Sequence, residues 1–89
     1  MPSKKLHIVN PLGLHARAAA KLVQLASRYA SDISLTKDDK TANAKSIMKV
    51  MMLAASRGSV IELSTEGSDA EEALAAISEM VENGFGELE

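Results

Sequence analysis

Two kinds of hydrophobic periodicity follow one another along this chain of 89 residues, and their order limits the fold more than any other feature. Short alternating segments are typical of strands with one buried face, and longer segments with apolar residues three and four apart are typical of helices. The expected elements are strand 6–9, helix 16–29, strand 33–36, strand 41–44, helix 47–56, strand 59–66 and a helix from 69 to Gly84. Strand 41–44 is expected from hairpin geometry alone.

This βαββαβα order predicts an α+β fold, an open-faced sandwich whose four-stranded antiparallel sheet is covered on one side by three helices. No linker or repeat divides the sequence, so residues 1–89 are expected to form a single domain. Ser46 is expected to cap the second helix and Gly58 to end it in a left-handed conformation. Segment 68–71, Ser-Asp-Ala-Glu, predicts a capping box at the start of the third helix, which Gly84 ends.

Composition argues against several classes of protein. The chain has no cysteine, so disulfide bonds and thiolate metal sites are excluded. Its formal net charge is −2 and its aromatic residues are Tyr29 and Phe85, whereas nucleic-acid-binding domains carry basic surfaces and stacking rings. No stretch approaches the roughly 20 apolar residues that span a bilayer, and nothing resembles a secretory signal. We therefore expect a cytoplasmic protein that binds no nucleic acid and does not insert into a membrane.

Segment 10–17, NPLGLHAR, joins the first strand to the first helix. Pro11 and Gly13 indicate a turn, so His15 is expected at or next to the helix N-cap. The first backbone N–H groups have no acceptor inside the helix, and together with the helix dipole they form a site for an anion such as phosphate. The dipole also disfavours imidazolium, so a neutral, nucleophilic ring is expected. The Arg17 guanidinium adds donors suited to phosphate oxygens.

These groups suit a relay of phosphoryl groups better than a free-standing enzyme, because no general base and no cofactor pocket accompany the histidine. His15 would attack the phosphorus, and the oxygens would meet Arg17 and the N–H groups of Ala16 and Arg17. A helix end contributes about 0.3–1 kcal/mol, which is moderate enough to allow onward delivery. No cofactor and no metal are expected; His7 has no second ligand at metal spacing.

The same segment resembles the active-site loop of the HPr family, the phosphocarriers of the bacterial phosphoenolpyruvate-dependent phosphotransferase system. Segments 45–48 (KSIM), 50–53 (VMML), 58–63 and 69–85 also match in position, so the resemblance covers essentially the whole chain. It implies that His15 takes a phosphoryl group on Nδ1 from phosphorylated enzyme I and gives it to an EIIA-type protein or domain, in sugar uptake or its regulation. It also implies that Arg17 steadies the group.

Partner docking is expected on the first helix. Arg17, Lys21, Gln24 and Arg28 are spaced so that they share one helix face. Beside His15 this stripe is a candidate basic rim for acidic partners, where charges mainly raise the association rate.

The second helix has more apolar residues than one core-facing stripe requires. Val50, Leu53 and Ala54 are expected inside and the methionines outside, where flexible thioethers suit a surface that meets several partners. The family resemblance puts the docking positions at Ala16, Arg17, Ala20, Lys21, Gln24, Ser27, Met48, Lys49, Met51 and Met52.

Ser46 has a second interpretation besides capping. In relatives that have an HPr kinase, the serine at this position is phosphorylated, and the added charge weakens the encounter with enzyme I. The regulated form usually has glycine where this chain has Lys49. The resemblance therefore makes Ser46 a candidate regulatory site and an HPr kinase a candidate partner.

Two alternatives remain open. The nitrogen-related branch of the family (NPr) uses the same histidine chemistry and differs in its partners. In a different class, the chain is a non-catalytic α/β binding module in which His15 is only a helix cap. A monomer is expected in each case.

Overall fold

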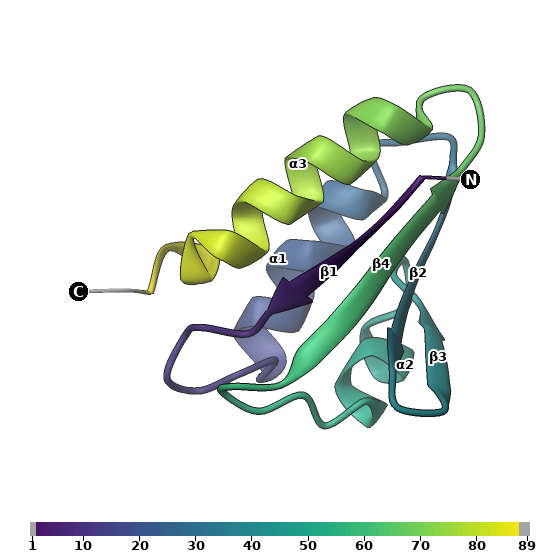
Figure 1. Ribbon diagram of the computed structural model, residues 1–89. Coiled ribbons are helices and arrows are strands. Elements are labelled where there is room, and N and C mark those ends of the chain that lie inside the picture. Colours follow the sequence, from purple (N-terminus) through teal and green to yellow (C-terminus); the bar gives the residue numbers. More distant parts are fainter. Residues whose placement is uncertain (1, 88–89) are drawn as a thin grey trace.

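A four-stranded antiparallel sheet with three α-helices on one face makes up the structure, a computed structural model that describes residues 2–87 (Figure 1). The elements are β1 (Ser3–His7), α1 (Ala16–Ala26), β2 (Asp32–Lys37), β3 (Lys40–Asn43), α2 (Ile47–Met52), β4 (Val60–Glu66), α3 (Ala70–Glu82) and the 3₁₀ helix η1 (Gly84–Gly86). The order across the sheet is β1-β4-β2-β3. The predicted open-faced βαββαβα sandwich is confirmed.

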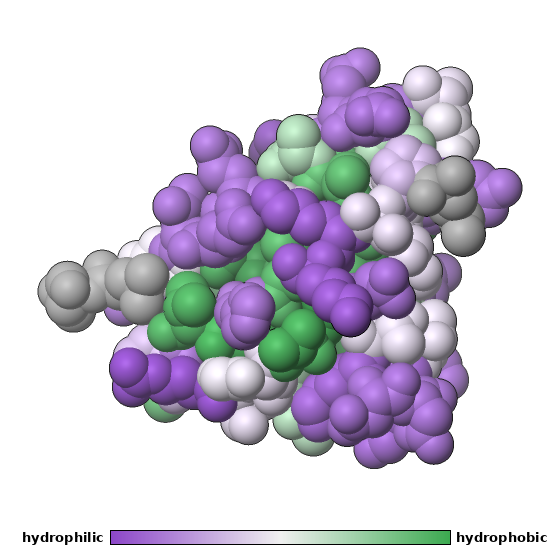
Figure 2. All heavy atoms as spheres, in the orientation of Figure 1, coloured by the Kyte–Doolittle hydropathy of each residue, from purple (hydrophilic) through white to green (hydrophobic). Residues whose placement is uncertain are grey.

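The two faces of the sheet differ as the alternation predicts. Leu6 lies opposite Ile61 in the β1–β4 pair and Leu35 opposite Leu63 in the β2–β4 pair, and all four are buried. Neighbouring positions such as Lys5 point to the other face and are exposed. Helix α3 contacts β1 and β4, and α1 contacts α2 and α3. In Figure 2 the surface is largely hydrophilic, with hydrophobic residues gathered near the middle of the view.

Helix α1 ends earlier than predicted. Its last residue is Ala26, whereas the periodicity predicted a helix to Tyr29. The backbone N–H groups of Arg28 and Tyr29 donate to carbonyls three residues back, which is the tightened geometry of a helix end. Arg28 therefore lies beyond the helix, and its predicted place on the helical stripe with Arg17 was wrong.

Helix α2 is also shorter than predicted. It ends at Met52, and Ala54 adopts a left-handed conformation with φ 52°. The prediction that Gly58 ends the helix was therefore wrong, although Gly58 does have a positive φ of 91°. Val50 and Leu53 are buried as expected, but Ala54 is exposed because the helical spacing stops before it. The carbonyl of Ala55 accepts a hydrogen bond from the Leu14 N–H at 2.9 Å, which ties this stretch to the loop before α1.

The capping box predicted at the start of α3 was wrong. Asp69 is the N-cap residue, and its side chain makes no cap hydrogen bond. Its carboxylate instead accepts hydrogen bonds from the Ser31 hydroxyl and from the N–H groups of Ala30 and Ser31. These bonds, led by the Ser31 hydroxyl, lower the pKa of Asp69 below its ordinary value. Asp69 thus fastens the start of α3 to the segment between α1 and β2.

Strand limits differ slightly from the predictions. β1 pairs with β4 over Ser3–His7 instead of 6–9, and β3 covers Lys40–Asn43 instead of 41–44. Asp38 has a positive φ of 57° and sits in the tight turn that pairs Lys37 with Lys40. Within residues 2–87, no helix has the length and apolar character to cross a membrane.

Candidate functional site

The loop between β1 and α1 is fixed by its glycine. The N–H of Gly13 donates to the carbonyl of Asn10 at 3.1 Å and closes a turn. Gly13 has a φ of +65°, and a Cβ at this position would lie 2.6 Å from the carbonyl oxygen of Ala55. Only glycine therefore fits this close approach without a shift of backbone. The loop is thereby held against the chain that follows α2.

His15 is the N-cap residue of α1, as the sequence predicted. Its backbone is extended (φ −75°, ψ 177°), and its carbonyl accepts the N–H of Ala19 at 2.8 Å. Its side chain makes no cap hydrogen bond and is 26% exposed. The N–H groups of the first turn, including those of the exposed Ala16 and Arg17, have no acceptor inside the helix. The imidazole of His15 therefore lies at the positive end of the α1 helix dipole.

Glu87 is the residue of the site that the sequence analysis missed. Its Oε2 atom lies 2.7 Å from Nε2 of His15, and its Oε1 atom accepts a hydrogen bond from Nδ2 of Asn10 at 3.0 Å. The Asn10 hydrogen bond, followed by the contact with His15, lowers the pKa of Glu87 below its ordinary value of 4.5. Glu87 is therefore ionised near neutral pH, and an ionised carboxylate only accepts hydrogen bonds. Nε2 of His15 must carry the proton, which leaves Nδ1 with the lone pair when the ring is neutral.

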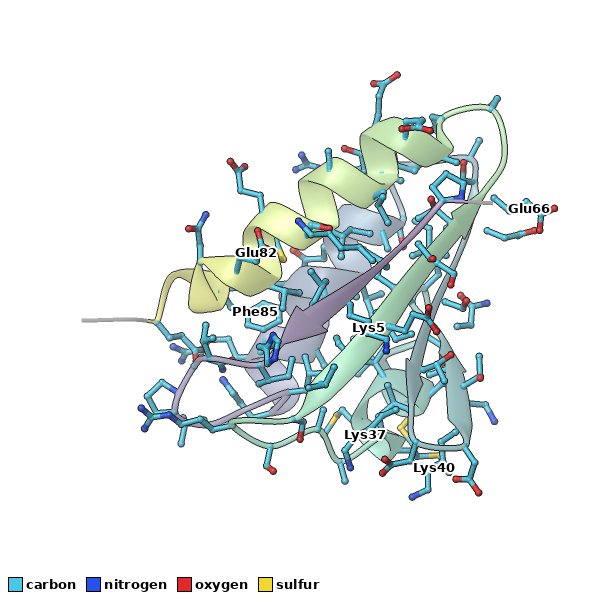
Figure 3. All side chains as sticks on the ribbon, viewed as in Figure 1. Lys5, Lys37, Lys40, Glu66, Glu82 and Phe85 are labelled. Atoms are coloured by element: carbon cyan, nitrogen blue, oxygen red, sulfur yellow. The ribbon has the colours of Figure 1, made fainter. Side chains whose placement is uncertain are left out.

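The segment after α3 carries Glu87 to the histidine. α3 ends at Glu82, and Gly84 turns the chain with a φ of 62°, as predicted for the end of this helix. Phe85 lies at the end of α3 with its side chain directed into the molecule (Figure 3), where it is only 3% exposed. Nζ of Lys21 donates to the Phe85 carbonyl at 2.9 Å. A buried ring and a lysine from α1 thus hold this segment in place.

An open depression of about 520 Å³ surrounds the histidine and is lined by Pro11, Leu12, His15, Arg17 and Glu87. It brings together an imidazole, a guanidinium, a carboxylate and the first turn of a helix. This set can accept a small anionic group on Nδ1, with Arg17 and the helix N–H groups as donors to its oxygens.

The positions predicted for docking have different surroundings. Ala16, Arg17, Gln24 and Ser27 are exposed on or next to α1, while Ala20 and Lys21 are partly buried. The ammonium of Lys21 donates to the Phe85 carbonyl and so also holds the segment after α3, and its place on the docking rim stays a prediction. On α2, Lys49 is exposed, and the methionines Met48, Met51 and Met52 are 72%, 40% and 64% exposed.

Exposed apolar residues also extend beyond the predicted docking set. Leu12, in the loop before His15, is 71% exposed, and Ile47 of α2 is 41% exposed. Ser46 caps α2 as predicted, since its hydroxyl accepts the N–H of Lys49 at 3.3 Å. His7 lies in β1 on the exposed face of the sheet.

The fold and this site define a class of small open-faced sandwich proteins that present a histidine at a helix N-terminus. Residues 2–83 match the family model described as "PTS HPr component phosphorylation site". The chain therefore belongs to the HPr family of phosphocarrier proteins of the phosphotransferase system.

Individual relatives agree with this assignment. The chain is 48% identical over 89 residues to the phosphocarrier protein HPr of Neisseria meningitidis serogroup A, with 100% of each sequence covered. The solved structure of HPr-C-His from Thermoanaerobacter tengcongensis superposes with a TM-score of 0.96 at 48% identity, covering 100% of both chains. HPr from Bacillus anthracis gives a TM-score of 0.87 at 51% identity, covering 90% of this chain and 95% of that one.

Proposed function

We propose that this protein is a cytoplasmic phosphocarrier that accepts a phosphoryl group on Nδ1 of His15 from phosphorylated enzyme I and delivers it to an EIIA-type protein or domain. The observation that carries the proposal is the contact between Nε2 of His15 and the carboxylate of Glu87 at 2.7 Å. Because that contact occupies Nε2, the lone pair on Nδ1 is the one available for attack.

The transfer itself needs little from the protein besides positioning and charge. The Nδ1 lone pair forms the new N–P bond while the bond between phosphorus and the donor group on enzyme I breaks, and its electron pair stays on that donor group. The peripheral oxygens carry most of the charge in the loose transition state. Arg17 and the first-turn N–H groups of α1 would stabilise them through charge-assisted hydrogen bonds.

In the onward transfer His15 is the leaving group: an acceptor atom of the EIIA-type protein forms a new bond to phosphorus while the Nδ1–P bond breaks and its electron pair returns to Nδ1. The open depression at His15 leaves the phosphoryl group reachable by a second protein. The exposed apolar residues of α2 and the loop residue Leu12 offer a surface on which enzyme I and an EIIA-type protein would bind in turn. A shared surface suits a carrier, since donor and acceptor need the same histidine at different times.

The test is incubation with enzyme I and phosphoenolpyruvate. The proposal expects one acid-labile, alkali-stable phosphoryl group per chain, detected by intact mass and by stability at low and high pH. His15→Ala should take up none, whereas His7→Ala, which removes the other histidine, should be labelled like the wild type. Label on the His15→Ala variant, or none on the wild type, would overturn the proposal.

A further inference from the structure

Asn10 is a fully buried polar residue next to the site. It is 0% exposed, and its Nδ2 donates to the carbonyl of Gly13 at 2.8 Å and to Oε1 of Glu87 at 3.0 Å. Its own Oδ1 is buried and has no hydrogen-bond partner among the residues that the structure describes. A buried polar atom without a partner costs free energy. The benefit of an asparagine at this position therefore comes from the two hydrogen bonds that its Nδ2 donates.

We propose that Asn10 is the positioning residue of the phosphoryl-transfer site: it holds the Glu87 carboxylate so that it accepts the Nε2–H of His15 and leaves Nδ1 as the nucleophile. This inference rests on the proposed phosphocarrier function. A single amide reaches both the turn that precedes His15 and the carboxylate that contacts it. Asn10 thus sets the relative position of two segments that are 77 positions apart in sequence.

The arrangement matters most during the transfer. As the Nδ1 lone pair forms its bond to phosphorus and the bond to the donor group breaks, the imidazole ring gains positive charge. The Glu87 carboxylate, 2.7 Å from Nε2, is placed to stabilise that charge. A carboxylate free to rotate would lose part of this effect, because reorientation would then accompany the reaction.

The surrounding charges explain why a neutral donor is needed beside the carboxylate. Lys21 contributes to the lowered pKa of Glu87, but its ammonium is bonded to the Phe85 carbonyl. Arg17 lines the same depression, and in the proposed function its guanidinium binds the phosphoryl oxygens. The main cause of the lowered pKa of Glu87 is the Asn10 hydrogen bond. Asn10 therefore orients the carboxylate without adding a cation that would compete for the phosphoryl group.

A double-mutant cycle of Asn10→Ala and Glu87→Ala tests the proposal. We expect Asn10→Ala to lower the maximal rate of phosphoryl acceptance about 2- to 12-fold, the range that one hydrogen bond supports, with little change in the KM for enzyme I. In the Glu87→Ala background, where the acceptor is gone, Asn10→Ala should cause little further loss. Equal losses in both backgrounds would mean that Asn10 only stabilises the loop. A faster Glu87→Ala variant would make Glu87 a competitor of the phosphoryl group. Either result would overturn the proposal.

NMR can detect the contacts of Glu87 with Asn10 and His15 in the absence of phosphoryl transfer. Asn10→Ala should raise the pKa of Glu87 towards its ordinary value, measured on its side-chain carboxyl carbon, and should shift the His15 ring nitrogens. Ser78→Ala, which also removes a buried and unpaired polar atom, is the matched control and should change neither signal. If Asn10→Ala does not fold, Glu87→Ala with Asn10 intact should shift the Asn10 side-chain amide and speed its exchange with solvent. Unchanged amide signals in that variant would refute the contact.

The cycle also separates this inference from the proposed function. A wild type that takes up no phosphoryl group would refute the carrier function. A wild type that is labelled on His15, with Asn10→Ala transferring at the wild-type rate, would refute only the role of Asn10.

Discussion

Nε2 of His15 lies 2.7 Å from Oε2 of Glu87, although 72 positions separate the two residues. The site is therefore assembled from both ends of the described chain: the β1–α1 loop supplies the histidine and the segment after α3 supplies the carboxylate. Three contacts hold the two segments together: the burial of Phe85, the hydrogen bond from Lys21 to the Phe85 carbonyl, and the hydrogen bond from Asn10 to Glu87.

The first prediction concerns Phe85, which anchors the segment that carries Glu87. Phe85→Ala should lower the free energy of unfolding by about 3–5 kcal/mol, because a buried ring is removed from the core. It should also slow phosphoryl acceptance, because Glu87 is released from His15. Urea unfolding and transfer kinetics measure the two effects. Phe85→Leu, which keeps a buried apolar side chain, should show both to a smaller extent. Wild-type stability of Phe85→Ala would show that the ring is no anchor.

How much of the fold could be predicted from the sequence depends on how far apart along the chain the interacting residues lie. The element order and the N-cap position of His15 follow from local periodicity and turn residues, and they were predicted. The ends of α1 and α2 were not predicted. The stretches that follow them are held by distant residues, since Asp69 accepts from the Ala30 N–H and Leu14 donates to the Ala55 carbonyl. Asp69 fits a local capping pattern but binds the segment after α1 instead. Local signals and distant partners compete for the same carboxylate, and sequence alone does not say which wins.

The same reasoning applies to the site. His15 and Arg17 were found because they belong to one short segment with a distinctive chemistry. Asn10 was read only as part of a turn, and Glu87 is one acidic residue among many. Their pairing is visible only when the fold brings residues 77 positions apart together.

The second prediction concerns Arg17. Arg17→Ala should slow phosphoryl transfer about 10- to 150-fold, which corresponds to the loss of one hydrogen bond to a charged group. Stability should change by less than about 0.5 kcal/mol, because Arg17 is exposed. Arg28→Ala is the matched control, since Arg28 is exposed and lies beyond the end of α1. Equal transfer rates for the two variants would remove Arg17 from the mechanism.

The third prediction is a dependence of stability on pH through Asp69. Its pKa is lower in the folded protein than the ordinary value of 3.8, chiefly because of the Ser31 hydroxyl. Its contribution is therefore complete above the unfolded pKa and is lost as the pH falls through the folded pKa. Ser31→Ala should raise the pKa of Asp69 and reduce the loss of stability on acidification. The measurement is urea unfolding at a series of acidic pH values, with Asp69→Asn as the variant that removes the titration. An identical pH dependence in all three proteins would exclude this linkage.

The fourth prediction separates two roles of Ser46. Ser46→Ala should lower the free energy of unfolding by about 0.5–1 kcal/mol, because the cap of α2 is lost. Ser46→Asp keeps an acceptor at the cap and adds a negative charge where the helix dipole favours it, so stability should be retained. That charge lies next to the exposed methionines and should weaken coupling with enzyme I. Unchanged coupling in Ser46→Asp would leave Ser46 with a purely structural role.

The last prediction concerns the exposed methionines of α2. Met48 and Met52 are 72% and 64% exposed, so they contribute little to the core and are available to a partner. Met48→Asp and Met52→Asp should each raise the KM for enzyme I by about tenfold, since a charge replaces an apolar contact worth about 1–2 kcal/mol. The maximal rate should change little, because His15 and its neighbours are untouched. Val60→Asp is the matched control: Val60 is 46% exposed but lies on β4, outside the proposed docking surface. If Val60→Asp raises the KM as much as the methionine variants do, the effect is one of net charge and the docking surface does not include α2.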